Sequence, residues 1–315
     1  MNTPRLLVIR GGAIGDFILT LPALDALRER WPRAHIEILG YPRIIELARQ
    51  RRYADAVRSI EAGPLARFFA PDAELDPALV EYFRGFNLVI SYIFDPDKIF
   101  ADNIRRCGVR HVVEAAPRPT DLHAAEHYCK PLESLAIYTG KFQPRLHLNP
   151  TDRAAAKKFL PSHNINTDAA LVAIHPGSGG DRKNWPPEKF GALARWLADE
   201  LDAQLLVVHG EADDIAVAKF LEQISPRPFH RARGLGLVEL AAVLEHCAAF
   251  VGNDSGVTHL TAAVGTPTIA MFGPASTPLW HPRGENVFVI PFGPRDTALA
   301  RDTIVGLLPE TIQRR

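Results

Sequence analysis

The sequence has few cysteines and no apolar stretch long enough to cross a membrane. Its 315 residues include only three cysteines, Cys107, Cys129 and Cys247, and none belongs to a C-x-x-C pair. This scarcity argues against a disulfide scaffold or a cysteine-based zinc site and fits a reducing compartment. The N-terminus holds only a short apolar run, 6–9, and no apolar stretch of about 18 residues occurs. We therefore expect a cytoplasmic protein whose contact with membranes is at most peripheral.

The chain also lacks an excess of charge of either sign. Lys plus Arg number 36 and Asp plus Glu number 36, so the formal net charge is +0. Proteins that bind nucleic acid through its phosphates carry a surplus of basic residues, so nucleic acid is not an expected partner. The composition, 47% hydrophobic and 23% charged, is that of a folded globular protein. The length suits two domains.

The order of apolar segments predicts an α/β protein with two doubly wound, parallel-sheet domains. A strand at 6–9, a glycine-rich turn, a helix at 17–30 and a strand at 36–39 form a βαβ unit. From residue 171 onward strands and helices alternate, which indicates a parallel sheet covered on both faces. In such folds ligands bind at the carboxyl ends of the strands. The second series comprises strands 171–174, 205–208, 250–251 and 268–271 and helices 188–201, 214–224, 238–247 and 257–264.

We place the domain boundary in a stretch rich in proline, asparagine, threonine and lysine. Within the first domain, further patterns predict helices near 44–50 and 77–84 and a strand at 88–93. The prediction is an N-terminal Rossmann-like domain, a second Rossmann-like domain and a final segment, covering residues 1–160, 161–295 and 296–315.

The loop after the first strand, 10–16, is rich in glycine but lacks the G-x-G-x-x-G order of a dinucleotide site. Gly11, Gly12 and Gly15 allow a tight turn and the close approach of a substrate. Asp16 lies beside the start of the following helix, where two roles are open. It can cap the helix, or it can act as a general base, because a helix N-terminus favours the ionised carboxylate.

The loop 175–190 contains the elements of a phosphate site. Ser178 and Gly179 directly follow a strand and make backbone amides available to an anion, and Lys183 adds a mobile positive charge. A solvated lysine in a polar loop is the alternative.

The loop after strand 205–208 presents Glu211 at the edge of the sheet. A carboxylate at this place can accept hydrogen bonds from ribose hydroxyls. The neighbouring Asp213 or Asp214 is expected to cap the next helix.

The segment 252–263 is the most specific of the loops. Asp254 and Ser255 offer capping groups, Gly256 permits close approach, and the helix behind them directs its positive end at the site. A pyrophosphate suits this arrangement. His259 lies one turn further along the same helix face. It is either a buried, hydrogen-bonded histidine or a contact to phosphate or to Asp254.

Two other sets of charged residues are weaker candidates for a functional site. Asp95 and Asp97 do not form a D-x-D pair at a strand end, and no His or Cys cluster has ligand spacing, so we expect no metal site. A set of arginines in the first half could bind phosphate or carboxylate groups, although a solvated charged helix face is the simpler interpretation. These are Arg43, Arg49, Arg51, Arg52 and Arg58.

In combination, the segments 10–24, 175–190 and 251–274 resemble glycosyltransferase family 9, the ADP-heptose:lipopolysaccharide heptosyltransferase family. The resemblance spans both halves of the chain in the same order. It implies a GT-B fold, in which two Rossmann-like domains face a cleft, the first binding the acceptor and the second the nucleotide sugar. The final segment would then be a helix that crosses back to the first domain.

The resemblance also implies an inverting, metal-independent reaction without a cofactor. A heptose or related sugar would pass from a nucleotide-diphosphate donor, ADP-heptose, to a hydroxyl of a lipopolysaccharide core or other envelope glycan at the inner membrane. Asp16 matches the catalytic base, Lys183 the diphosphate contact and Glu211 the ribose contact. Asp254, Ser255, Gly256 and His259 match the donor motif. In the first loop this chain has glycine and alanine where some relatives have hydroxyl residues, so those polar contacts to the acceptor are absent.

Two other functions fit the same two-domain shape. A nucleotide-sugar epimerase would convert the donor into an isomer without any acceptor. A non-catalytic nucleotide-sugar binding protein would bind the donor and glycosylate nothing.

Overall fold

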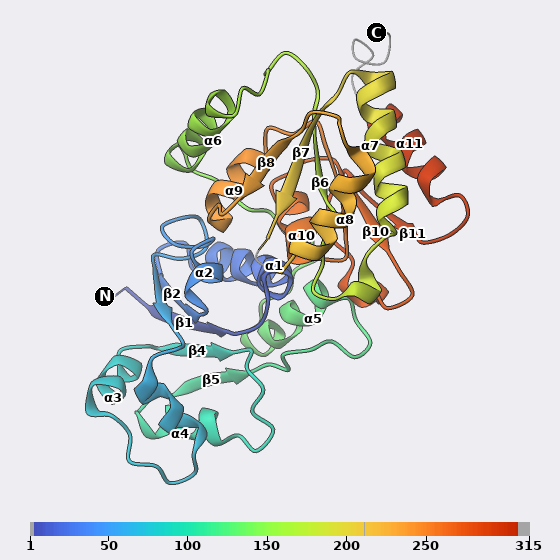
Figure 1. Cartoon of the computed structure of the whole chain (residues 1–315). Helices are drawn as coiled ribbons and strands as arrows, with labels where there is room; N and C mark the ends of the chain where they lie inside the picture. The colour runs from blue at the N-terminus through green and yellow to red at the C-terminus, as the bar shows by residue number, and fades with distance from the viewer. Residues whose placement is uncertain (1–2, 211, 308–315) are drawn as a thin grey trace. The chain divides into compact units, whose positions relative to one another are not determined.

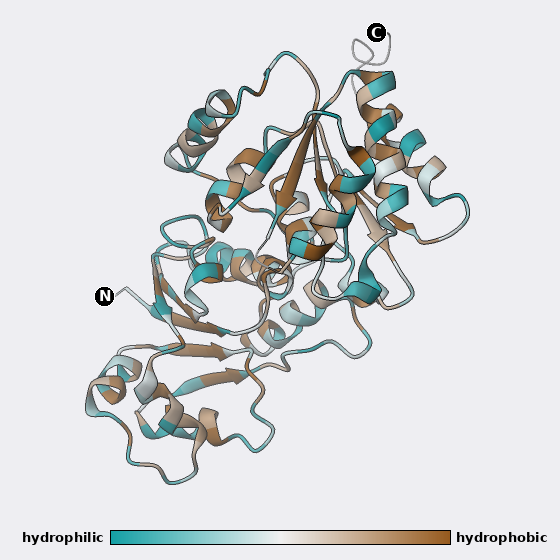
Figure 2. Ribbon diagram, viewed as in Figure 1, coloured by the Kyte–Doolittle hydropathy of each residue, from teal (hydrophilic) through white to brown (hydrophobic). Residues whose placement is uncertain are grey.

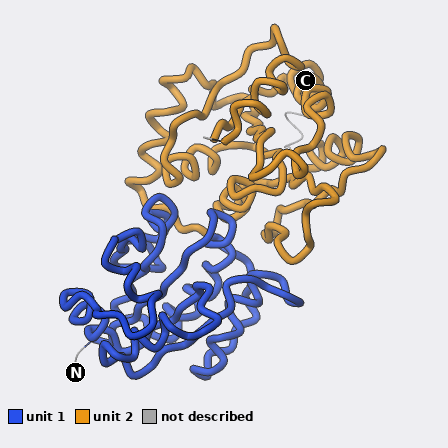
Figure 3. The backbone as a smooth tube through the Cα atoms, turned by 60° about the horizontal axis from the view of Figure 1, so that its bottom comes forward, with its two compact units in different colours: residues 1–144 blue, residues 145–315 orange. Residues whose placement is uncertain are grey.

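The structure is a computed structural model and describes residues 3–210 and 212–307. The chain divides into two compact units, residues 1–144 and 145–315 (Figure 3). Each unit is built on one parallel sheet (Figure 1). Across the described ranges, no helix combines the length and apolar character that a membrane span needs.

Unit 1 contains a five-stranded parallel sheet in the order β3-β2-β1-β4-β5. The strands are β1 (Arg5–Arg10), β2 (His35–Gly40), β3 (Ala56–Ser59), β4 (Leu88–Ser91) and β5 (His111–Glu114). The helices are α1 (Ile14–Arg30), α2 (Pro42–Ile45), α3 (Pro77–Arg84), α4 (Ile99–Arg106) and α5 (Ala124–Cys129), with short 3₁₀ segments η1 (Gly63–Phe69) and η2 (Lys130–Leu135).

The core of unit 1 follows from the alternation of side chains along its strands. Leu7 and Ile9 of β1 point to the same face, where they join Phe83 of α3 and Phe100 of α4 in one buried cluster. The remaining residues of β1 are also buried from Leu6 onward, because helices cover both faces of the sheet. Figure 2 shows the resulting hydrophobic strands of both sheets.

Unit 2 contains a six-stranded parallel sheet in the order β11-β10-β9-β6-β7-β8. The strands are β6 (Leu171–His175), β7 (Gln204–His209), β8 (His230–Arg233), β9 (Ala249–Asn253), β10 (Thr268–Phe272) and β11 (Val287–Pro291). The helices are α6 (Pro150–Ser162), α7 (Pro187–Leu201), α8 (Asp214–Ile224), α9 (Leu237–Leu244), α10 (Gly256–Ala263) and α11 (Asp296–Leu307), with η3 (Asp181–Lys183) and η4 (Pro278–Trp280).

The division between the units lies at residue 144, whereas we predicted it at residue 160. The reason is that the segment after Pro144 is bonded to unit 2. The amide of Leu146 donates to the carbonyl oxygen of Ala263 at 2.7 Å. Arg153 on α6 donates through two nitrogens to the carboxylate of Glu245, at 2.7 Å each, and α6 packs against α9. The composition of the sequence reveals a polar linker, but it cannot show that this segment bonds to Ala263 and Glu245.

The described part of the final segment forms α11, which packs against α7 and β11 within unit 2. Its first residue, Asp296, is 1% exposed and holds this packing together. The carboxylate accepts hydrogen bonds from Trp185 Nε1 at 2.8 Å and from Lys189 Nζ at 2.7 Å. Residues 308–315 lie outside the described residues, so the predicted return of the segment to the first domain stays a prediction.

Asp296 should make the protein sensitive to acid. Burial acts to raise the pKa of Asp296, but hydrogen bonds from Lys189 and Trp185 outweigh it and lower the pKa below its usual 3.8. A carboxyl whose pKa is depressed by folding stabilises the fold above its unfolded pKa, and this contribution is lost as the pH falls through the folded pKa. The melting temperature of wild type should therefore exceed that of Asp296→Asn at neutral pH, and the difference should shrink below about pH 4. Thermal unfolding across this range tests it; a difference independent of pH would contradict it.

Most predicted elements are present, but the helix predicted near 44–50 is wrong. Only α2 is helical there, and the chain continues through tight turns in which Gln50 takes a positive φ of 53°. Residues Arg49 and Arg51 instead form bridges to Ala54. We also did not predict the four edge strands. β3, β5 and β8 have four residues each and lack a continuous apolar run, whereas β11 is apolar throughout and was simply missed.

Candidate functional site

Asp16 lies in the first turn of α1, at the carboxyl end of β1. The helix begins at Ile14, earlier than predicted, so Asp16 is its third residue and Gly15 belongs to the helix rather than to the loop. The Asp16 Oδ2 atom accepts a hydrogen bond from the amide of Ala13 at 2.7 Å, so the capping role is confirmed. Gly12 has a φ of +100°, and a Cβ there would lie 2.8 Å from Asp16 Oδ2. Glycine at position 12 therefore makes room for the carboxylate.

The second oxygen of Asp16 faces two groups that sequence analysis did not assign to the site. Arg10 Nη2 and the Tyr128 hydroxyl each lie 3.4 Å from Asp16 Oδ1. Burial raises the pKa of Tyr128 to about 12, so at neutral pH its hydroxyl keeps the proton and can donate. The Asp16 side chain is 23% exposed. Its carboxylate therefore remains accessible to solvent although both of its oxygens have partners.

Arg10 holds α1 and the Tyr128 ring in place around Asp16. It is 3% exposed, and its Nε donates to Thr20 Oγ1 at 2.9 Å while Nη2 donates to the carbonyl oxygen of Asp16 at 3.2 Å. The guanidinium carbon lies 4.3 Å from the centre of the Tyr128 ring. In the sequence, Arg10 is noticeable only as a charged residue at the end of an apolar strand. No local pattern links it to Tyr128 on α5.

A small pocket of about 270 Å³ opens at the same sheet edge, beyond the ends of β4 and β5. It is lined by Phe94, which is 74% exposed, and by Pro117 among others. The single proton of the Tyr128 hydroxyl lies between two acceptors, Pro117 O at 3.0 Å and Asp16 Oδ1 at 3.4 Å, and the shorter contact is to Pro117. The predicted loop residue Gly11 lies against Ile93, another lining residue, since a Cβ on it would be 3.9 Å from Ile93 Cγ2. The pocket thus adjoins the carboxylate.

The other charged groups of unit 1 are used within the fold. Both oxygens of Asp95 accept amide hydrogen bonds from the first turn of α4. Four of the singled-out arginines have partners nearby: Arg49 pairs with Glu46, Arg51 donates to backbone carbonyls, Arg52 pairs with Asp25 and Glu29, and Arg58 lies over Tyr82.

In unit 2, the loops after β6, β7 and β9 come together at the carboxyl ends of these strands. Lys183 Nζ donates to Asp254 Oδ2 at 2.7 Å; the lysine side chain is 38% exposed and the aspartate 7%. Asn253, fully buried, accepts from the amide of Trp185 at 2.8 Å and donates to the carbonyl of Pro176 at 2.8 Å. Sequence analysis did not identify Asn253 as a support of this loop. The residue holds the lysine loop against the start of α10.

The predicted donor-side residues occupy distinct positions around this pair. Ser255 is the N-cap of α10 and its Oγ accepts from the amide of Thr258, and Gly256 is the first residue of the helix. His259 is buried on α10, at 4% exposure. Ser178 closes a turn with Gly180, and Gly179 between them is exposed. Glu211 lies outside the described residues.

Asp213, one of the two residues expected to cap α8, occupies the N-cap position of this helix but does not cap it with its side chain. Its side chain makes no capping bond and turns instead to His175, whose Nε2 lies 2.8 Å from Asp213 Oδ2. The same oxygen accepts from the amide of Gly210 at 2.8 Å. Burial acts to raise the pKa of Asp213, but the hydrogen bond and charge of His175 outweigh it and lower the pKa. The carboxylate is therefore ionised beneath the loop of unit 2.

We expect that the stability of unit 2 requires glycine at position 177. A Cβ there would lie 2.0 Å from Asp213 Oδ1, so Gly177→Ala must push the carboxylate away from His175. We expect a loss of about 1 to 3 kcal/mol in the free energy of unfolding, as for other overpacked sites. Gly179→Ala is the matched control, because nothing lies within 4 Å of its added Cβ. Urea unfolding of both variants checks this; equal stabilities would contradict it.

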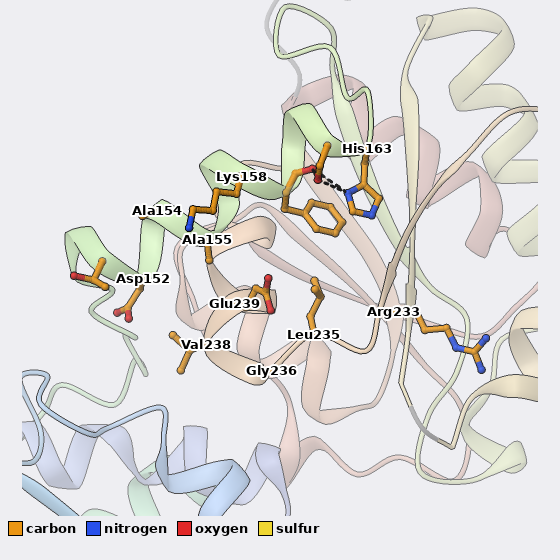
Figure 4. A pocket seen from close by; sticks show the side chains of 13 residues that line it. Asp152, Ala154, Ala155, Lys158, His163, Arg233, Leu235, Gly236, Val238 and Glu239 are labelled. Carbon is orange, nitrogen blue, oxygen red and sulfur yellow. Dashed lines mark hydrogen bonds between the residues drawn. The ribbon is translucent and has the colours of Figure 1, made fainter.

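A larger groove of about 840 Å³ runs between α6 and the β8–α9 connection (Figure 4). Lys158 of α6 and His163, which follows the end of that helix, line one side, and Leu235 and Glu239 line the other. None of the residues predicted for the site lines it.

Comparison with known proteins identifies relatives along most of the chain. A sequence model described as glycosyltransferase family 9 (heptosyltransferase) matches residues 96–298. Lipooligosaccharide heptosyltransferase 2 of Haemophilus influenzae is 28% identical over 155 residues, 47% of this chain and 44% of that protein. Lipopolysaccharide heptosyltransferase 3 of Escherichia coli is 24% identical over 293 residues, 87% of this chain and 83% of that protein.

The solved structure of Escherichia coli ADP-heptose LPS heptosyltransferase II superposes with a TM-score of 0.74 at 19% identity, covering 96% of this chain and 98% of that one. The predicted fold, two parallel-sheet α/β units of the GT-B class, is confirmed.

Proposed function

This chain belongs to glycosyltransferase family 9, the heptosyltransferase family, and from that membership we propose that it transfers a heptose from ADP-heptose to a hydroxyl of the lipopolysaccharide core. The observation that carries the proposal is the set of groups at the carboxyl edge of the unit 2 sheet. An ammonium, a hydroxyl and the N-terminus of α10 gather there in a family member. This is the chemistry that binds a diphosphate.

The donor's diphosphate would bind to Lys183, Ser255 and the amides at the start of α10. Glu211 would contact the ribose, and Ser178, Gly179, Asp254 and His259 would complete the donor site. Binding the diphosphate releases Lys183 from Asp254, so the ammonium exchanges one anionic partner for another. The helix N-terminus and Lys183 neutralise the charge that develops as the diphosphate departs.

Asp16 would act as the general base. Its carboxylate takes the proton from the acceptor hydroxyl as that oxygen attacks the anomeric carbon, and the bond from that carbon to the diphosphate breaks. Attack opposite the leaving group inverts the configuration at that carbon. Ala13 and Arg10 hold the carboxylate in place, so the reaction needs little rearrangement of the base.

The acceptor sugar would enter the pocket beside Asp16. The exposed ring of Phe94 offers an apolar face on which a sugar ring can stack, and Tyr128 links the pocket wall to the base. A glycolipid acceptor would bring the reaction to the cytoplasmic face of the inner membrane through peripheral contact.

The experiment supplies ADP-heptose and a lipopolysaccharide core that lacks its heptose, and follows the acceptor by mass spectrometry. We expect a gain of one heptosyl unit, with NMR of the product showing inversion at the anomeric carbon. Donor incubated alone is the control that separates the alternatives. Conversion to an isomer would indicate an epimerase, and binding without product on any core acceptor would indicate a binding protein.

A further inference from the structure

The pocket beside Asp16 is lined by acidic and uncharged side chains. It has a volume of about 270 Å³ and lies at the carboxyl edge of the unit 1 sheet, where the neighbouring strands β4 and β5 end (Figure 1). Two carboxylates, Asp95 and Glu114, belong to its wall. Of the described residues that line it, none other is charged. A ligand in this pocket therefore meets negative charge and no cation from the lining side chains.

The strand register brings Ser91 and Glu114 together in this wall. The two residues are partners in the parallel ladder between β4 and β5, and each is the last residue of its strand. Val89 and Val112, two positions earlier, both contact the core cluster on one face of the sheet, so side-chain alternation places Ser91 and Glu114 on that face as well. Neighbouring strands lie about 4.8 Å apart. One ligand can therefore contact both side chains.

Both side chains keep hydrogen-bonding capacity that the fold does not use. Ser91 is 5% exposed, yet no group within residues 3–210 and 212–307 hydrogen-bonds to its hydroxyl, and the oxygen is not sealed from solvent. Glu114 Oε1 accepts from Arg105 Nη2 at 2.5 Å, while Oε2 has no partner in the same ranges. Buried polar groups are normally hydrogen-bonded, so an open hydroxyl at this depth indicates a place for a ligand.

The cation that contacts this wall is already paired. Arg105 on α4 is bonded to Glu114 and also to Asp102, at 2.8 Å, so these three side chains together carry one negative charge. Lys98 and Arg118 are exposed and lie close in sequence to the lining segments, but neither is among the residues that line the pocket. The wall therefore remains acidic.

We propose that this pocket selects an acceptor sugar that carries no carboxylate or phosphate. Hydroxyls of such a sugar can donate to Glu114 Oε2 and exchange hydrogen bonds with Ser91, while an apolar face of the ring packs on Phe94, which is 74% exposed. An anionic group at the same place would face Glu114 and Asp95, and like charges brought together disfavour binding. That the ligand is a sugar rests on the proposed function, whereas the selection against negative charge rests on the pocket itself.

Binding measured by saturation-transfer NMR, without donor, tests the selection. The probes are a methyl heptoside, the same glycoside with its terminal CH₂OH oxidised to a carboxylate, and the glycoside phosphorylated on one ring hydroxyl. We expect the wild type to bind the neutral glycoside at least about 10-fold more tightly than either anionic form. Equal affinities, tighter binding of an anionic form, or no binding of the neutral glycoside would overturn the proposal.

Glu114→Gln should move the affinities for the neutral and carboxylated glycosides in opposite directions. The neutral glycoside loses a charge-assisted hydrogen bond and should bind about 3- to 10-fold more weakly. The carboxylated glycoside should bind about 10-fold more tightly, because the repulsion falls and Arg105 is released from Glu114. Weaker binding of both glycosides by folded Glu114→Gln would overturn the proposal, and thermal unfolding identifies variants that fail to fold.

Asp102→Asn is the matched control for this substitution. It removes the other partner of Arg105, which does not line the pocket, so it should change neither affinity. If it shifted the two affinities as Glu114→Gln does, the selection would come from Arg105 and not from the acidic wall, which would overturn the proposal.

Ser91→Ala tests the open hydroxyl. We expect the neutral glycoside to bind about 3- to 10-fold more weakly, the usual value of a hydrogen bond. Ser59 also ends a strand of this sheet, but its Oγ accepts from the amide of Glu61 and it does not line the pocket, so Ser59→Ala should bind like the wild type. Wild-type affinity in Ser91→Ala would overturn the role assigned to Ser91.

Heptosyl transfer is measured separately from these affinities. If the glycosides bind as expected but no core acceptor gains a heptose, the proposed function fails and the selection against negative charge stands.

Discussion

Replacing Asp16 with asparagine is expected to lower kcat for heptosyl transfer by about 10²- to 10⁴-fold, the range that general-base assistance supplies. Asparagine has nearly the same shape, and its amide oxygen can still accept the hydrogen bond from Ala13, so α1 keeps its cap. The variant loses the negative charge that faces Arg10 Nη2 at 3.4 Å, and with it the capacity to take a proton from the acceptor hydroxyl. Steady-state kinetics with ADP-heptose and a core acceptor measure the effect, and the Kd for ADP should stay unchanged.

Asp76 provides a matched control for this substitution. It also lies at the start of a helix in unit 1, where its Oδ1 accepts from the amides of Ala78 and Leu79 at 2.9 and 3.1 Å. Asp76→Asn removes a capping charge without touching the proposed base, so kcat should not change. If the Asp16→Asn variant kept the kcat of the wild type, Asp16 could not be the general base.

Replacing Lys183 with methionine should have the second-largest effect, on donor binding. The substitution removes the ammonium that would bind the diphosphate, and it leaves Asp254, at 7% exposure, without its partner and close to the incoming anion. Removing one member of a hydrogen-bonded charge pair costs about 2 to 5 kcal/mol at binding sites, which corresponds to a loss of about 30-fold or more. We expect kcat/KM for ADP-heptose to fall about 10²-fold or more. Isothermal titration with ADP should show a matching loss of affinity.

Lys189 is the control for Lys183. Its side chain is exposed to the same extent, 37%, and donates to another buried carboxylate, Asp296, also at 2.7 Å. Lys189→Met should therefore lower stability by removing the partner of Asp296, but it should leave the Kd for ADP unchanged. If both substitutions weakened ADP binding equally, the effect of Lys183→Met would come from a less stable fold and not from a lost contact to the ligand.

The local elements were predictable where a single physical rule dominates. The buried strands β1, β6 and β7 are continuous apolar runs, and helix α3 between Pro77 and Arg84 has the expected bounds. Trp31 ends α1 because proline follows it. The edge strands other than β11 and the segment after α2 could not be predicted, since their conformation depends on partners far along the chain.

The candidate site could be predicted only in part, for a related reason. A strand end followed by glycine and a polar residue is visible in the sequence, which is why Asp16, Lys183 and Asp254 were singled out. Their supports are not visible in this way. Tyr128 comes to Asp16 from 112 residues away, and Asn253 and Asp213 gain their roles from loops that only the assembled sheet brings together. Asp213 takes the N-cap position of α8, but its side chain makes a tertiary hydrogen bond to His175 in place of a local capping bond.

The indole of Trp185 is placed where it can report optically on ligand binding. It is 1% exposed, its backbone amide is bonded to Asn253 and its ring nitrogen to Asp296, and it follows Lys183 by two positions. The chain contains four tryptophans, and the other three, Trp31, Trp196 and Trp280, are partly exposed. A variant with phenylalanine at those three positions would leave one tryptophan, whose emission, excited at a wavelength that the tyrosines do not absorb, would follow the lysine loop in solution.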